Sequence, residues 1–205
     1  MSSAAARVVL ASGNRGKLRE LSALLAPLGL SILPQNDFGI ESPPETGSTF
    51  VENALIKARH AATRTSLAAL ADDSGLEVDA LGGLPGVRSA RYAGEHATDR
   101  DNLEKLLHAL AAVDRGERTA RYQCAMVFVS SPDDPAPLIA AASWEGTLVA
   151  APRGTGGFGY DPIFVPLGET LTVAEMPAER KNALSHRGRA LAKLRAALTT
   201  RLAGR

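Results

Sequence analysis

Apolar runs separated by glycine- and proline-rich breaks organise the first part of the chain. Residues 7–12 form a short apolar run that Gly13 and Gly16 close, which is typical of a strand entering a loop. Leucines recur every three or four positions over residues 17–28, and this spacing predicts an amphipathic helix. Residues 34–47 hold three prolines and two glycines and predict a loop.

A second helix is predicted after that loop. Thr49 and Glu52 have the spacing of a capping box, and an alanine-rich apolar stripe continues to about Arg64. Three polar residues share another face of this helix: Asn53, Lys57 and His60.

An acidic pair follows the next apolar segment. Residues 67–71 predict a small strand, and Asp72 and Asp73 come directly after it. Apolar and polar residues alternate again over residues 76–80, so we place the acidic pair at the end of a strand.

The second half of the chain continues the alternation of helices and strands. Thr98 and Asp101 begin a leucine-rich helix, and residues 122–130 and 138–149 predict two strands of a meander. A final helix is predicted over residues 185–202. This order indicates an α/β fold.

Length, composition and charge narrow the class of protein. The chain has 205 residues, of which 45% are hydrophobic, and this is enough to bury one core. We therefore predict that residues 1–205 form a single domain with two lobes and no separate linker. The net charge of +1 gives no global attraction for nucleic acid or an anionic membrane. No apolar stretch approaches a bilayer span and Arg7 interrupts any signal-like region, so we expect a cytoplasmic protein. We interpret the one cysteine, Cys124, as a buried reduced thiol.

The first candidate for chemistry is the loop of residues 12–17. Backbone N–H groups at a helix start, together with Lys17, suit a phosphate. The loop is not a Walker A motif, because Ala11 stands at the first glycine position and Leu18 replaces the magnesium-binding hydroxyl. Plain turn chemistry is the alternative interpretation of this loop.

The second candidate is the acidic run of residues 71–75. Adjacent carboxylates point to opposite sides of an extended backbone, so one can face a site, and a hard cation with a phosphate ligand suits such a carboxylate. Glu45 is a possible second oxygen ligand. An Asx-type turn at the acidic run and a solvated Glu45 are the alternatives.

Two further candidates lie in the second half. The glycine-rich residues 154–162 present two aromatic rings and one carboxylate, which suit recognition of a base by stacking and by hydrogen bonds to its edge. The other candidate is Lys181 with residues 185–188. A glycine-rich loop and a helix start are the respective alternatives.

In this order, the motifs resemble the inosine/xanthosine triphosphate pyrophosphatase family, and the resemblance covers almost the whole chain. They are SGNRGKLRE (residues 12–20), ETGSTFVENALIKA (45–58), ADDSGLEVDAL (71–81), LPGVRSARYAG (84–94), TGGFGYDPIF (155–164) and SHRGRAL (185–191).

The resemblance implies a mixed, elongated central β-sheet flanked by helices, with two lobes and a nucleotide cleft between them, and a homodimer. It implies hydrolysis of ITP, dITP and XTP to the monophosphate and pyrophosphate with Mg²⁺, for which Mn²⁺ could substitute. Glu45 and Asp73 would bind the metal, and Asp73 would also be the general base for water, while Asp72 would shape its loop. The residues implied to bind the substrate are Ser12, Gly13, Asn14, Arg15, Gly16, Lys17, Ser74, Phe158, Gly159, Tyr160, Asp161, Lys181, His186 and Arg187.

Three other functions are weighed against this one. A pyrophosphatase for modified pyrimidine or ordinary nucleotides is disfavoured by the motifs that resemble a purine pocket. A nucleotide sensor without catalysis is disfavoured because both Glu45 and Asp73 are present. A nucleic-acid-binding module is weaker still, because the basic final helix is explained as a solvated face.

Overall fold

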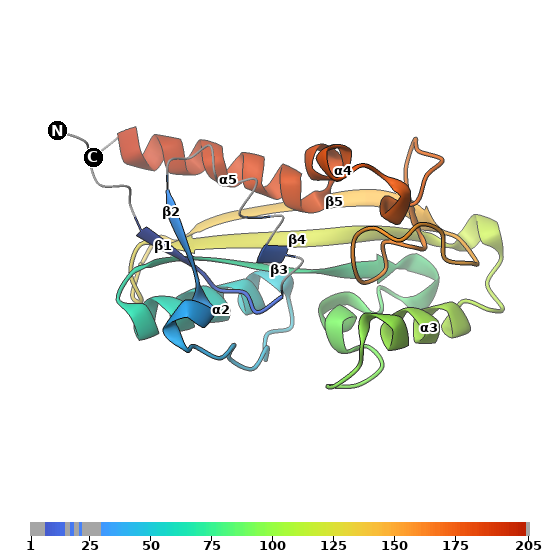
Figure 1. Cartoon of the computed structure of the whole chain (residues 1–205), viewed down its shortest axis with the longest axis horizontal. Coiled ribbons are helices and arrows are strands. Elements are labelled where there is room, and N and C mark those ends of the chain that lie inside the picture. Colours follow the sequence, from blue (N-terminus) through green and yellow to red (C-terminus); the bar gives the residue numbers. More distant parts are fainter. Residues whose placement is uncertain (1–6, 15–16, 19–20, 22–29, 204–205) are drawn as a thin grey trace. The chain divides into compact units, whose positions relative to one another are not determined.

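The computed structural model describes residues 7–14, 17–18, 21 and 30–203, and Figure 1 shows the order of its elements. Strand β1 is parallel to both β2 and β3, and β6 is antiparallel to β5, so the sheet is mixed, as the resemblance implied. Six strands form it, in the order β2 (Ser31–Pro34), β1 (Arg7–Leu10), β3 (Ala68–Val78), β4 (Thr119–Val129), β5 (Leu138–Leu148) and β6 (Phe164–Pro166).

The chain divides into two compact units. Unit 1 comprises residues 1–73, 125–141 and 188–205, and unit 2 comprises residues 74–124 and 142–187. Each unit has a core and a set of polar residues of its own, and we describe them in turn.

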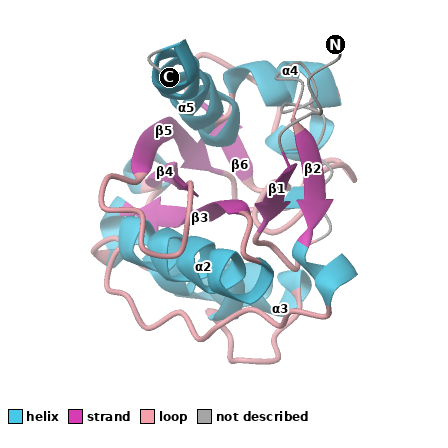
Figure 2. Cartoon of the chain, turned by 90° about the vertical axis from the view of Figure 1, so that its left-hand side faces the viewer, coloured by secondary structure: helices cyan, strands magenta, loops and turns pink. Residues whose placement is uncertain are grey.

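Unit 1 packs helix α2 (Phe50–Thr65) closely against its strands. Helix α5 (His186–Ala203) lies on the opposite face of the sheet from α2 (Figure 2). The contact of α2 is made mostly of small side chains, which allow a close approach of helix to sheet. These core residues are Val9, Ala11, Ala54, Ala58, Ala61, Ala62, Ala69, Ala71, Val127 and Val129.

The core of unit 2 is built from larger apolar side chains than the α2 contact of unit 1. Helix α3 (Asp99–Ala109) contributes Leu103 and Leu106, which pack with Trp144 and Phe164 of the strands. The short helix α4 (Ala178–Leu184) precedes α5, and Ser185 separates the two. This apolar core supports the loop of residues 154–162, whose Gly156 N–H donates to the Ala174 carbonyl at 3.0 Å.

Most predicted elements are confirmed where the structure describes them. The capping box of Thr49 starts α2, and the equivalent box of Thr98 starts α3. The two meander strands and the final helix agree with the prediction to within a few residues. The sequence did not predict β2, β6 or α4. Of the helix predicted over residues 17–28, positions 19–20 and 22–28 lie outside the described residues.

The predicted strand end at the acidic pair is wrong. Strand β3 continues without a break through Asp72, Asp73, Ser74 and Gly75, so no Asx-type turn forms there. Strand β1 pairs with β3 over residues 68–70, before the acidic pair, and β4 is the neighbour of β3 on its other side, where sheet pairing favours an extended backbone over a turn. Asp72 and Asp73 therefore project to opposite sides of a strand.

Along the described part of the chain, no helix is both long enough and apolar enough to span a membrane.

Candidate active site

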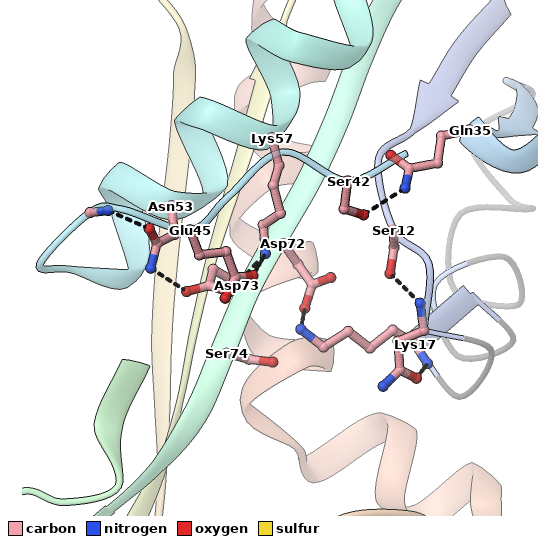
Figure 3. Close-up of polar contacts among 12 residues, drawn as sticks. Ser12, Lys17, Gln35, Ser42, Glu45, Asn53, Lys57, Asp72, Asp73 and Ser74 are labelled. Carbon is pink, nitrogen blue, oxygen red and sulfur yellow. Dashed lines mark hydrogen bonds and ion pairs between the residues drawn. The ribbon is translucent and has the colours of Figure 1, made fainter. Parts of the chain in front are cut away.

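Two carboxylates of unit 1 converge on one ammonium group. The Lys57 Nζ of α2 lies 2.7 Å from Asp73 Oδ1 and 3.0 Å from Glu45 Oε1 (Figure 3). The Lys57 and Asp73 side chains are 8% and 6% exposed, so this ion pair is largely shielded from water. The family resemblance implied Glu45 and Asp73 as metal ligands, and the structure places both beside Lys57.

Burial and charge act on these groups in opposite directions. Burial raises the pKa of Asp73 above its ordinary value, and the attraction of Lys57 and Lys17 opposes this rise. Burial alone would lower the pKa of Lys57, but the charges of Asp73, Asp72 and Glu45 outweigh burial and raise it. Lys57 is therefore a firmly protonated cation between carboxylates.

A buried amide completes the surroundings of Asp73. Asn53 Nδ2 donates to Asp73 Oδ2 at 3.3 Å, and its Oδ1 accepts the Gly47 N–H at 2.8 Å (Figure 3). Each oxygen of Asp73 thus faces one donor, Lys57 or Asn53. The plane of the Asp73 carboxylate is fixed from both sides.

The other acid of the pair, Asp72, contacts the N-terminal loop. Its Oδ2 lies 3.1 Å from Lys17 Nζ, and its side chain is fully buried. Our expectation that Asp72 shapes a loop is wrong, because it lies within β3 and pairs with Lys17 from that strand.

The loop before Lys17 is held by its own side chains. Ser12 Oγ accepts the Asn14 N–H at 3.3 Å, and Asn14 Oδ1 accepts the Lys17 N–H at 3.0 Å. Gly13 is exposed, and a methyl group on it would lie 3.8 Å from Ser42 Oγ. Two further residues of the predicted phosphate cradle, Arg15 and Gly16, lie outside the described residues.

In unit 2, a buried network surrounds Asp161. Tyr122 Oη donates to Asp161 Oδ1 at 3.1 Å, while Asp161 Oδ2 accepts from Lys181 Nζ at 2.8 Å and from the Phe158 N–H at 3.0 Å. Burial and the Asp161 charge raise the pKa of Tyr122 well above its ordinary value, so Tyr122 remains a neutral donor. The network fixes the backbone that carries the Phe158 ring.

Phe158 has two cations against its ring. Lys181 Nζ lies 4.7 Å and Arg187 Cζ 5.4 Å from the ring centroid. Arg187 Nη2 also donates to Ser74 Oγ at 3.0 Å, so Ser74, the first residue of unit 2, joins this group. The His186 ring stacks on Tyr122 with centroids 4.7 Å apart and planes inclined by 10°.

The two remaining predicted residues of this group make contacts inside unit 2. Tyr160 Oη donates to the Ser89 carbonyl at 2.8 Å, and burial raises the pKa of Tyr160. The Gly159 N–H donates to Asp99 Oδ2 at 2.8 Å, and Gly159 has φ +59°, a conformation that glycine adopts without strain. Both residues help to shape the loop that presents Phe158.

Sequence reasoning missed the parts that Asn53, Lys57 and Tyr122 play. The helical spacing showed Asn53 and Lys57 on one face, but not that this face meets Asp73. The sequence signal for Asn53 and Lys57 is that they lie four positions apart beside an alanine stripe. Polar side chains in a helix that packs so closely need hydrogen-bonding partners. Tyr122 gave no signal beyond strand alternation.

The described residues include no group of three or more histidine, cysteine, aspartate or glutamate side chains that could hold a metal ion by itself. The polar set of unit 1 has two carboxylates and cationic or amide partners. Such a set suits a cation that takes further ligands from a phosphate.

The sequence profile of the Ham1 family matches residues 8–197. This protein belongs to the Ham1 family. A relative from Shigella flexneri, named dITP/XTP pyrophosphatase, is 56% identical over 192 residues, which cover 94% of this chain and 98% of the relative. A relative of the same name from Methylococcus capsulatus is 57% identical over 188 residues, covering 92% and 94%.

Solved structures of the Ham1 family have the same fold. The Ham1 protein from Coxiella burnetii superposes with a TM-score of 0.87 at 50% identity, covering 95% of this chain and 99% of that chain. The Ham1 protein of Staphylococcus aureus gives 0.83 at 37% identity, covering 95% and 99%. The family and the mixed α/β fold expected from the motifs are thereby confirmed.

Proposed function

We propose that this protein hydrolyses the deaminated purine nucleotides ITP, dITP and XTP to the monophosphate and pyrophosphate. The relatives named dITP/XTP pyrophosphatase support this proposal, since they share more than half of their residues with this chain over nearly its full length. The observation that carries it is the placement of Asp73 and Glu45 around Lys57, because this charge pattern suits a metal and a polyphosphate. We infer a cytoplasmic location from this proposed activity.

The carboxylates of Glu45 and Asp73 fit a Mg²⁺ ion, with Mn²⁺ as a substitute. Both offer hard oxygen donors, and Mg²⁺ commonly binds one or two carboxylates together with substrate phosphates. When bound, the ion would supply positive charge against the phosphates and the leaving pyrophosphate. Loss of activity in EDTA, restored by Mg²⁺ or Mn²⁺ and not by Zn²⁺, tests the choice of metal.

Asp73 is suited to orient and deprotonate the attacking water. Its pKa is raised by burial, which makes it a stronger base than an exposed aspartate. The donors Lys57 and Asn53 hold its two oxygens in place. The proton removed from water would go to the Asp73 carboxylate, and Lys57 would keep its charge throughout.

The phosphates are assigned to the N-terminal loop of unit 1. Ser12, Asn14 and Lys17 would bind them, with Gly13, Arg15 and Gly16 as further contacts. Lys17 Nζ pairs with Asp72, and this ion pair fixes the position of the ammonium group. That fixed position supports Lys17 as a residue that binds a phosphate.

The base is assigned to unit 2. The Phe158 ring would stack on a purine, and the Arg187 guanidinium with the His186 ring would donate to the 6-oxo group of hypoxanthine or xanthine. Adenine carries a donor at that position and would leave these donors unpaired. Ser74, Gly159, Tyr160, Asp161 and Lys181 would contact or support the nucleotide.

Replacing Asp73 with asparagine tests the proposed chemistry. The amide keeps the shape and can still accept from Lys57, but its NH₂ group would face the Asn53 NH₂, it carries no charge and it cannot take up a proton. Turnover of ITP should therefore fall at least about 100-fold. Pyrophosphate release measures turnover, and circular dichroism checks that the variant is folded. Near-normal turnover in a folded Asp73→Asn variant would remove Asp73 from the reaction.

We also infer a homodimer, which rests on the family resemblance. Light scattering coupled to gel filtration tests it, and a molar mass of one chain across micromolar concentrations would exclude the dimer.

A further inference from the structure

Helices α2 and α3 begin with the same arrangement of side chains. A threonine caps each helix, an acid completes a capping box, and a buried asparagine follows: Thr49, Glu52 and Asn53 in α2, and Thr98, Asp101 and Asn102 in α3. Asn53 is 0% and Asn102 is 2% exposed. The same capping box followed by a buried asparagine therefore occurs at the start of both helices.

The two asparagines use their oxygen atoms alike. Asn53 Oδ1 accepts the N–H of Gly47 at 2.8 Å, and Asn102 Oδ1 accepts the N–H of Ala93 at 2.7 Å. A backbone N–H only donates, so these contacts fix the orientation of each amide. The NH₂ group of each asparagine is then left to donate to a second partner.

What the NH₂ groups meet is different. Asn102 Nδ2 donates to the Ala90 carbonyl at 3.0 Å, so this side chain only ties a loop to its helix. Asn53 Nδ2 donates to the carboxylate of Asp73 at 3.3 Å. In α2 the same arrangement thus reaches an ionisable group from another element.

Asn53 also holds the segment that carries Glu45. Gly47, two residues after Glu45, approaches so closely that a methyl group on it would lie 2.7 Å from Asn53 Oδ1 and 2.6 Å from Glu52 Cβ. Lys57 joins the same two carboxylates through its charge. A cation bound by Glu45 and Asp73 would repel the Lys57 ammonium group, but it would not repel the neutral Asn53 amide. The Asn53 hydrogen bonds can therefore stay in place when the cation binds.

We propose that Asn53 is a positioning residue, whose amide holds Asp73 and the Glu45 segment in the arrangement that binds the metal and orients water. This inference rests on the proposed function. Residues that orient metal ligands typically change metal affinity or activity by about 10–100-fold when they are replaced.

The test compares Asn53→Ala with Asn102→Ala, which likewise removes one accepted and one donated hydrogen bond, but at the start of α3 and with no carboxylate partner. Both variants should lower the melting temperature. Only Asn53→Ala should weaken Mn²⁺ binding to the nucleotide-free protein, followed by electron paramagnetic resonance, and lower kcat for ITP, each by at least about 10-fold. Asn102→Ala should stay within about threefold of wild type in both. Asn53→Ser, whose hydroxyl is too short to reach both partners, repeats the comparison if the alanine variant does not fold.

Equal Mn²⁺ affinity and equal kcat in the Asn53 and Asn102 variants would overturn the inference, because the amide would then serve stability alone. That result would leave the proposed function intact, since wild type would still release pyrophosphate. A wild-type protein that releases none from ITP would overturn both.

Discussion

At the scale of single residues, Lys57 is a charged side chain whose burial depends on its acidic partners. Its side chain is nearly buried, and it faces two carboxylates. Burial of an unpaired charge is costly, so Lys57, Glu45 and Asp73 depend on one another for stability as well as for chemistry. Removing Lys57 should therefore leave two carboxylates without their cation.

We expect Lys57→Met to lower the free energy of unfolding at pH 7 by about 3–5 kcal/mol, because it breaks a buried ion pair. Mg²⁺ should then raise the melting temperature of Lys57→Met more than that of wild type, since the ion can replace the missing charge. Lys105→Met is the control for loss of a lysine, because the exposed Lys105 donates to the Tyr92 carbonyl and pairs with no carboxylate among the described residues. Mg²⁺ stabilisation no greater than in wild type would count against a cation site at Glu45 and Asp73.

At the scale of elements, helix α5 is anchored near its C-terminus by a further buried acid. Asp134, in the connection between β4 and β5, lies 3.2 Å from Arg201 Nη1, and Arg201 also donates to the Ala136 carbonyl. Burial alone would raise the pKa of Asp134, but hydrogen bonds from Ser130 and Ala136 and the Arg201 charge lower it to about 2.

This lowered pKa makes stability depend on acidity in a defined direction. The unfolded chain binds the Asp134 proton near pH 4 and the folded chain only near pH 2, so the contribution of Asp134 is complete above pH 4 and is lost as the pH falls to 2. We expect Asp134→Asn to cost about 1–2 kcal/mol at pH 7 and progressively less at pH 4, 3 and 2. Urea unfolding at each pH measures this, and a difference that does not change with pH would contradict it.

The elements also show what the sequence could and could not predict. Local signals sufficed for α2 and α3, because a capping box and helical spacing lie within one segment. The course of β3 through Asp72 and Asp73 was mispredicted, because an extended backbone there depends on the neighbouring strand β4, which is distant in the sequence. The place of Lys57 was not predictable either, since its partner Asp73 lies 16 residues further along the chain.

At the scale of the whole molecule, the motifs gave the family and the fold, and the structure added how each unit holds its polar residues. Unit 1 gathers acids, an amide and ammonium groups, which suit a metal and phosphates. Unit 2 gathers the Phe158 ring with Arg187 and Lys181, which suit a purine base. Under the proposed function, the first set would bind the phosphates and the second set the base.

The most direct measurement of the proposed reaction follows the products formed from ITP, XTP and ATP by phosphorus-31 NMR, with Mg²⁺ present. We predict pyrophosphate and the monophosphate from ITP and XTP, at a kcat/KM at least about 100-fold above that for ATP, because the donors of unit 2 match a 6-oxo group and not a 6-amino group. Release of orthophosphate in place of pyrophosphate, or equal kcat/KM for ITP and ATP, would contradict the account.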